Sequence, residues 1–217
     1  MPIILTYATA LLLGSLHALE TDHMAAVTSF AARRPGLRQS VRFGVSWAMG
    51  HGGAILLIGT MLLVLGIQLP ASAAGALERV VGAMMIGLGI WTVRGATTLH
   101  AHVHSHDGHA HAHVHSHAIT RSHDHRHAAT AVGMLHGLAG TGAAVALIPV
   151  ATSTSTLAAI LFLLVFALGT VAGMAVYGLL AGFVLGRTAE RSVRMARALA
   201  RFTGLITIAV GIWWLLR

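Results

Sequence analysis

His17-Ala-Leu-Glu-Thr-Asp-His23 lies inside a stretch that is otherwise mostly apolar from Ile3 to Ala32. Two histidines and two carboxylates therefore occur at the centre of a segment long enough to cross a membrane, because a hydrocarbon core of about 30 Å requires about 20 mostly apolar helical residues. A charged side chain at that depth costs about 2.5–3.5 kcal/mol on insertion scales. The two carboxylates must therefore be paired or must face a polar cavity.

The composition of the chain is that of an integral membrane protein. Of its 217 residues, 56% are hydrophobic and only 9% are charged, and the mean hydropathy is +0.77. The first apolar stretch is too long and too polar at its centre for a signal peptide. The chain has no cysteine, which excludes disulfides, thiolate metal ligands and thiol redox chemistry. Six stretches are apolar and long enough to span a bilayer, namely residues 3–31, 42–66, 77–94, 128–150, 157–185 and 202–216.

The arginines predict how these six spans are oriented. All 14 basic residues are arginine, and 12 of them follow the first, third or fifth span. Only Arg79 and Arg217 fall on the opposite side. Because positive charge near the ends of spans collects on the cytoplasmic side, we expect both termini outside and residues 95–127 in the cytoplasm. The expected location is the cytoplasmic (inner) membrane, as a multi-pass protein.

The two halves of the chain resemble each other in sequence. The segment from Gly14 matches the segment from Gly133, and the segment from Phe43 matches the segment from Phe162, both at an offset of 119 residues. A third match, in the last span of each half, has an offset of 122 residues. Three spans per repeat place the halves in opposite orientations, which is typical of transporters whose substrate site lies at the repeat interface near the bilayer midplane.

These observations predict the fold class and the organisation of the chain. We expect an all-α integral membrane protein with six transmembrane helices in a 3+3 inverted repeat. Residues 1–94 would form the first three-helix repeat and residues 128–217 the second. Residues 95–127 would form a His-rich cytoplasmic loop between them.

Four of the 16 histidines lie within predicted spans, and these are His17, His23, His51 and His136. At a rise of about 1.5 Å per residue, the last three are expected about 12–15 Å from the water boundary, near the midplane. His17 would lie about a turn and a half farther outward. Neutral imidazole with carboxylate, and without sulfur, suits nickel, cobalt or zinc better than calcium or magnesium. Converging histidines beside Asp22 therefore predict an intramembrane metal site.

A straight helix cannot aim the whole first motif at one ion. At about 100° per residue, His17 and Asp22 are about 140° apart around the axis, and His17 and His23 are about 120° apart. Either the helix is distorted here, as midplane binding helices of transporters often are, or the residues are successive stations along a path. Further candidate ligands or supporting residues near the site are Glu20, Thr21, Thr141 and Thr170.

The histidine-rich segment between the two repeats is of low complexity. Such a composition cannot build a packed core, so we expect it to be disordered without metal. Alternating histidines bind divalent metals with little discrimination, which indicates a cytoplasmic metal-buffering tract. The alternative is a dispensable solubilising linker. The candidate buffering residues are His100, His102, His104, His106, His109, His111, His113, His115, His117, His123, His125 and His127.

Three motifs together resemble a known family. His17-Ala-Leu-Glu-Thr-Asp-His23, followed by Met-Ala-Ala-Val, resembles the His-Ala-x-Asp-Ala-Asp-His signature of the nickel/cobalt transporter family and its urease-accessory and efflux relatives. Gly50-His51-Gly-Gly-Ala is similar to that family's Gly-His-Ser/Thr element. Leu135-His136-Gly-Leu-Ala-Gly is similar to the His-Gly-Leu-Ala-Gly-Ser element of its six-span branch. The resemblance implies that His17, Asp22, His23 and His51 select the metal, with His136 as an addition of that branch.

The resemblance implies a secondary transporter that moves nickel or cobalt across the cytoplasmic membrane. We expect uptake to be slightly favoured over efflux. At about 100 mV a dication gains about 4.6 kcal/mol on entry, which is a sufficient drive. We expect no enzymatic activity and no catalytic cofactor, only a transiently bound Ni(II) or Co(II). The expected partners are the lipid bilayer, the metal ion and a cytoplasmic metallochaperone or nickel-enzyme maturation system, and nucleic acid is not among them.

Two other functions stay open. The first is transport of another small solute, such as an amino acid or an inorganic anion, with the histidines as a proton relay. The second is an intramembrane metal-dependent hydrolase, which is disfavoured because the chain has no His-Glu-x-x-His helix and no evident serine or cysteine nucleophile.

Overall fold

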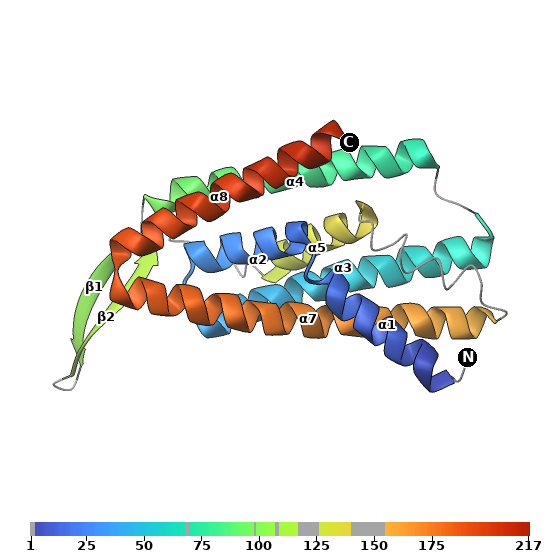
Figure 1. Ribbon diagram of the computed structural model, residues 1–217, viewed down its shortest axis with the longest axis horizontal. Helices are drawn as coiled ribbons and strands as arrows, with labels where there is room; N and C mark the ends of the chain where they lie inside the picture. Colours follow the sequence, from blue (N-terminus) through green and yellow to red (C-terminus); the bar gives the residue numbers. More distant parts are fainter. Residues whose placement is uncertain (1–2, 68–69, 98, 107–108, 117–125, 140–154) are drawn as a thin grey trace.

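Helices make up most of the molecule. The computed structural model describes residues 3–67, 70–97, 99–106, 109–116, 126–139 and 155–217. Within those ranges the chain forms seven helices and one β-hairpin (Figure 1). The helices are α1 (Ile3–His17), α2 (Thr21–Arg33), α3 (Leu37–Leu65), α4 (Ala71–Ala96), α5 (Arg126–Ala139), α7 (Thr156–Arg191) and α8 (Val193–Leu216).

Several of these helices are long and apolar enough to cross a membrane. Four of them, α3, α4, α7 and α8, meet that test singly, and α1 with α2 meets it as one span bent by 55°. The described residues therefore hold four or five candidate spans of a multi-pass membrane protein. The predicted span at 128–150 begins with the short helix α5, but residues 140–154 lie outside the described part of the chain. The sixth span thus stays a prediction.

The long helices lie in two pairs with shorter helices between them. In Figure 1, α4 runs beside α8 along one edge of the molecule and α3 runs beside α7 along the other, with α2 and α5 between. Small residues permit the close crossing of α4 and α8, because a Cβ atom added at Gly89 would lie 2.6 Å from the carbonyl oxygen of Gly204. Such contacts are typical of helix packing in membranes, where lipid competes for apolar surface and close backbone approach replaces the hydrophobic effect.

Polar contacts fix α2 inside this framework. The hydroxyls of Ser29 and Thr207 lie 2.7 Å apart and join α2 to α8. At its end, α2 contacts α4 through Arg33, whose Nη1 donates to the carbonyl oxygen of Trp91 at 2.6 Å and whose guanidinium lies over that indole ring. Buried hydroxyls and a buried guanidinium need such partners in an apolar interior. These contacts hold the second half of α2, and through the helix the residues at its start, at a defined position.

A two-stranded hairpin occupies part of the histidine-rich segment. Strands β1 (Leu99–His106) and β2 (His109–Ser116) pair antiparallel and project from the end of the molecule where α7 and α8 meet (Figure 1). Arg197 of α8 holds its base by donating two hydrogen bonds to the carbonyl oxygen of Leu99, at 2.9 and 2.6 Å. The composition predicted no regular structure here, but histidine alternating with small or branched residues also has the two-residue period of a strand.

Candidate metal centre

The break between α1 and α2 shapes the centre of the site. Helix α1 ends at His17, and the amide of Glu20 donates to the carbonyl of His17 at 3.1 Å in a tight turn. Asp22 then lies in the first turn of α2, where its carboxylate accepts a hydrogen bond from the amide of His23 at 2.9 Å. Carboxylates are favoured at helix N-termini because the amides there lack partners within the helix. The structure therefore has a distorted helix at this motif.

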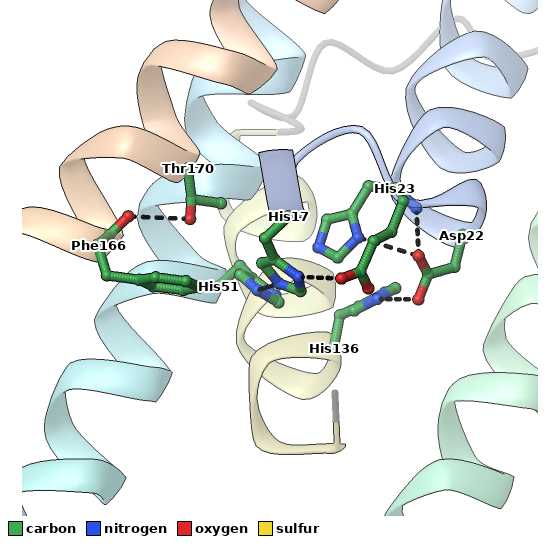
Figure 2. A network of polar contacts seen from close by, with 8 residues as sticks. His17, Asp22, His23, His51, His136, Phe166 and Thr170 are labelled. Carbon is green, nitrogen blue, oxygen red and sulfur yellow. Dashed lines mark hydrogen bonds and ion pairs between the residues drawn. The ribbon is translucent and has the colours of Figure 1, made fainter. Parts of the chain in front are cut away.

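The five residues predicted as metal ligands come together in the interior. His17 ends α1, Asp22 and His23 lie on α2, His51 lies on α3 and His136 lies on α5 (Figure 2). All five side chains are buried, and His17 is the most exposed at 5%. His17 was expected a turn and a half farther outward, but the bend brings its ring centroid to 4.6 Å from that of His23.

Short polar contacts connect the five residues. The Nε2 atoms of His17 and His51 lie 3.0 Å apart. Two nitrogens bound to one tetrahedral ion at about 2.1 Å would lie about 3.4 Å apart, so these imidazoles need little movement to share a metal. The Asp22 carboxylate lies 3.0 Å from Nδ1 of His23 through one oxygen and 3.0 Å from Nε2 of His136 through the other. Asp22 thereby bridges α2 and α5.

Two overlapping groups of side chains have ligand atoms close enough to hold an ion. One consists of His17, His23 and His51, and the other consists of Asp22, His23 and His136. Within each group the ligand atoms all lie within 4.8 Å of one another. Imidazole and carboxylate are the ligands that zinc, nickel and cobalt accept, whereas calcium and magnesium prefer oxygen alone. The arrangement is therefore suited to a divalent transition metal.

The supporting residues named from the sequence have different positions. Glu20 reaches Nδ1 of His17 at 2.9 Å with a side chain that is 39% exposed, so it connects the buried cluster to the surface. Thr170 is buried, but its hydroxyl donates to the carbonyl oxygen of Phe166 on its own helix (Figure 2). Thr21 begins α2 with an exposed side chain. Thr141 lies outside the described residues.

The predicted buffering histidines are divided among several parts of the chain. Residues 100–106 lie in β1, residues 109–115 lie in β2, and His127 lies in the first turn of α5. His117, His123 and His125 lie outside the described residues. In the register of the hairpin, histidine stands opposite histidine at every second position, in four pairs from His100 with His115 to His106 with His109.

Two aromatic side chains at the site were missed by the sequence analysis. The ring of Phe166 lies 5.5 Å from that of His17, and the ring of Trp47 lies 5.5 Å from that of His136. Both aromatic side chains are buried and wall the cluster with apolar surface. The available signal was the internal repeat, because Trp47 and Phe166 occupy matching positions in the two halves.

The charges of the site suit a dication. Asp22 and Glu20 together supply two negative charges beside the four imidazoles, and the rings can stay neutral when they ligate a metal. Ligating histidines usually contact a carboxylate through their second nitrogen, which orients the ring and raises its basicity. Glu20 is placed to do this for His17, whose other ring nitrogen faces His51.

Comparison with known proteins gives a family and a few distant relatives. The family described as "Cytochrome C biogenesis protein transmembrane region" matches residues 6–213. The chain is similar to the "Urease accessory protein UreH" of Bacillus sp. (strain TB-90), with 29% identity over 203 residues that cover 94% of this chain and 87% of the relative. No solved structure matches the chain significantly.

Two further relatives are matched over about half of their own length. The "Chloroplast protein FOR GROWTH AND FERTILITY 2" of Arabidopsis thaliana is 26% identical over 206 residues, which cover 94% of this chain and 54% of the relative. The "Putative nickel/cobalt efflux system" of Methanocaldococcus jannaschii is 32% identical over 94 residues, which cover 42% of this chain and 44% of the relative.

Proposed function

This chain belongs to the family of the cytochrome c biogenesis protein transmembrane region, and within that family we propose that it is a secondary transporter of a divalent transition-metal cation. The cation is nickel or cobalt, and uptake is favoured over efflux. It crosses the membrane through the buried cluster of His17, Asp22, His23, His51 and His136.

The observation that carries this proposal is the convergence of four imidazoles and one carboxylate from four separate helices. Such groups are expensive to bury in a membrane and are usually functional there. Their ligand atoms lie within 4.8 Å of one another in each of two groups, and thiolate ligands are absent because the chain has no cysteine. A hydrogen-bonding role would not require four histidines in one buried cluster.

The names of two relatives support a metal substrate. One is named as a urease accessory protein and another as a nickel/cobalt efflux system, and the first covers nearly the whole chain. The second name states efflux, and the first states no direction. Uptake is favoured here because the membrane potential drives a dication inward, at about 2.3 kcal/mol per charge for each 100 mV.

Packing contacts support the internal repeat on which alternating access would depend. A Cβ atom added at Gly14 would overlap the carbonyl of Phe166, and one added at Gly133 would overlap the carbonyl of Trp47. Gly133 follows Gly14 by 119 residues, and Phe166 follows Trp47 by 119 residues. The same contact is therefore made twice with the two halves exchanged, as a pair of inverted repeats would make it.

The experiment is nickel accumulation in cells that lack their own nickel transporters. The wild type is compared with His17→Ala, with a chain in which all twelve histidines from His100 to His127 are asparagine, and with the control Glu190→Gln on the exposed end of α7. We expect accumulation above the empty-vector level for the wild type and the control, and loss of that accumulation for His17→Ala.

The other outcomes are equally specific. If cells with the wild type hold less nickel than cells with the empty vector, and His17→Ala restores the empty-vector level, then the protein is a metal transporter that exports its ion. No change with nickel or cobalt in any variant would overturn the metal proposal in favour of another solute with the histidines as a proton relay.

A further inference from the structure

We propose that the buried cluster contains two overlapping ion stations, and that a dication passes from a station containing His17 to one containing His136, with His23 supplying a different ring nitrogen to each. This inference rests on the proposed metal transport and names the path of the ion within that site. Its ligands are the two groups described above, which have His23 in common.

His23 is built to serve both stations. Its Nδ1 atom faces the Asp22 carboxylate at 3.0 Å, on the side of His136. Among the described residues its Nε2 atom has no hydrogen-bond partner, although the side chain is fully buried. An unpartnered imidazole nitrogen in an apolar interior is costly unless it acquires a ligand. We assign Nε2 to the station of His17 and His51, and Nδ1 to the station of Asp22 and His136.

The geometry places His23 midway between the two exchanging histidines. Its ring centroid lies 4.6 Å from that of His17 and 4.5 Å from that of His136. The ring of His51 is similarly central, at 5.2 Å from His17 and 5.4 Å from His136. In passing between the stations, the ion exchanges its bonds to His17 and to Nε2 of His23 for bonds to His136 and to Nδ1 of the same ring, and the ring proton moves from Nδ1 to Nε2.

The internal repeat relates the same two histidines. His136 follows His17 by 119 residues, the offset that relates the two halves of the chain. Each packs against an aromatic ring at 5.5 Å, Phe166 for His17 and Trp47 for His136, and these two aromatics are related by the same offset. His17 and His136 thus occupy equivalent surroundings in opposite halves. An exchange of the ion between them matches an exchange of roles between the two repeats.

Sharing His23 limits the cluster to one ion at a time. A neutral imidazole has only one unprotonated ring nitrogen, so His23 offers a ligand atom to one station at a time. Two dications in a medium of low dielectric constant would also repel each other. The two stations are therefore alternatives, and removal of one leaves the other able to bind. Transport requires both, because the ion must pass from one to the other.

The test is nickel binding to the full-length protein in lipid nanodiscs, measured by titration calorimetry. The parent has asparagine in place of the twelve histidines from His100 to His127, so that the hairpin does not contribute heat. We compare His17→Ala, His136→Ala, the double variant and His23→Ala in that parent. Asn and Gln substitutions at the same positions, together with gel-filtration profiles, separate loss of ligand from loss of fold.

We expect one nickel per parent chain. His17→Ala and His136→Ala should each keep that ion with affinity lowered less than about 10-fold, whereas His23→Ala and the double variant should lower it more than about 100-fold, beyond the range for loss of an outer-shell partner. Each single variant should nevertheless abolish nickel transport in reconstituted vesicles.

Two results would overturn the two stations while leaving metal transport in place. Loss of more than about 100-fold affinity in both single variants would indicate one site with all ligands required at once. Two nickel ions per parent chain would indicate independent sites. Failure of the folded parent to bind nickel or cobalt at all would instead overturn the proposed function itself.

Discussion

Asp22 is the acidic residue most deeply buried in the described part of the chain, and its two oxygens divide between two histidines. One oxygen faces His23 and the other faces His136, 114 residues away in sequence. A lone carboxylate at this depth would be unstable, so its burial implies a cation or protonated partners. The sequence located this charge within a span, and the structure identifies which imidazoles surround it.

Glu20 offers the sharpest single-residue prediction, because it touches the cluster without belonging to either group of candidate ligands. We expect Glu20→Gln to weaken nickel binding by about 10-fold, the lower end of the range for partners of metal-ligating histidines, since its side chain is partly solvated. Binding is measured in the parent whose twelve histidines from His100 to His127 are asparagine. The matched control is Glu190→Gln, which is exposed on α7 and should bind nickel as the parent does. Equal affinities for parent and Glu20→Gln would show that the contact with His17 at 2.9 Å is incidental.

At the scale of elements, the position of α5 depends on how closely it approaches α3. Gly133 lies against the Trp47 carbonyl, and Gly137 lies against the backbone of His51. His136 therefore reaches the cluster only because the two backbones nearly touch. Larger side chains at these glycines would move α5 and its histidine away from Asp22.

We accordingly expect Gly133→Ala to lower the stability of the protein by about 1–3 kcal/mol, the usual cost of overpacking a well-packed interface. Gly53→Ala is the matched control on α3, because a Cβ atom added there meets nothing within 4 Å. Alanine at that helical position should be neutral or stabilising by up to about 1 kcal/mol. Thermal unfolding in detergent measures both variants, and a Gly133→Ala protein as stable as the wild type would contradict the close packing of α3 and α5.

The whole molecule has a predicted orientation that follows from the distribution of its arginines. The absence of cysteine makes the natural chain a ready background for site-directed labelling. Gln39 near the start of α3 and Ser72 near the start of α4 are both exposed. Because α3 and α4 are consecutive spans, their starts are expected on opposite sides of the membrane. They therefore report on the two sides of the membrane.

We expect a membrane-impermeant maleimide to label Ser72→Cys in intact cells and to label Gln39→Cys only after permeabilisation. The physical reason is the retention of arginine-rich segments on the cytoplasmic side. The wild type, without cysteine, is the blank for both reactions. Labelling of Gln39→Cys from outside would reverse the orientation of the molecule and the side from which the ion enters.

Much of the fold could be predicted because it depends on properties local to the chain. Hydropathy located the membrane-spanning helices, and α3, α4, α7 and α8 all include a predicted span. Helices α7 and α8 run farther than predicted and meet at Ser192, because arginine is a good helix former and the charged turns continue the helices. The strands in the histidine-rich segment were not predicted, since low complexity was given more weight than the two-residue alternation.

The sequence by itself determined that this is a multi-pass membrane protein, that histidines and carboxylates lie within its spans, and that its two halves share a pattern. Only the tertiary structure decided that α1 and α2 bend by 55°, that His17 lies level with His23, and that His136 reaches Asp22. The physical reason is the separation along the chain of the residues that determine each property. Burial in lipid depends on the local composition of a segment, whereas the meeting of these side chains depends on the close approach of helices that are far apart in sequence, such as α3 with α5.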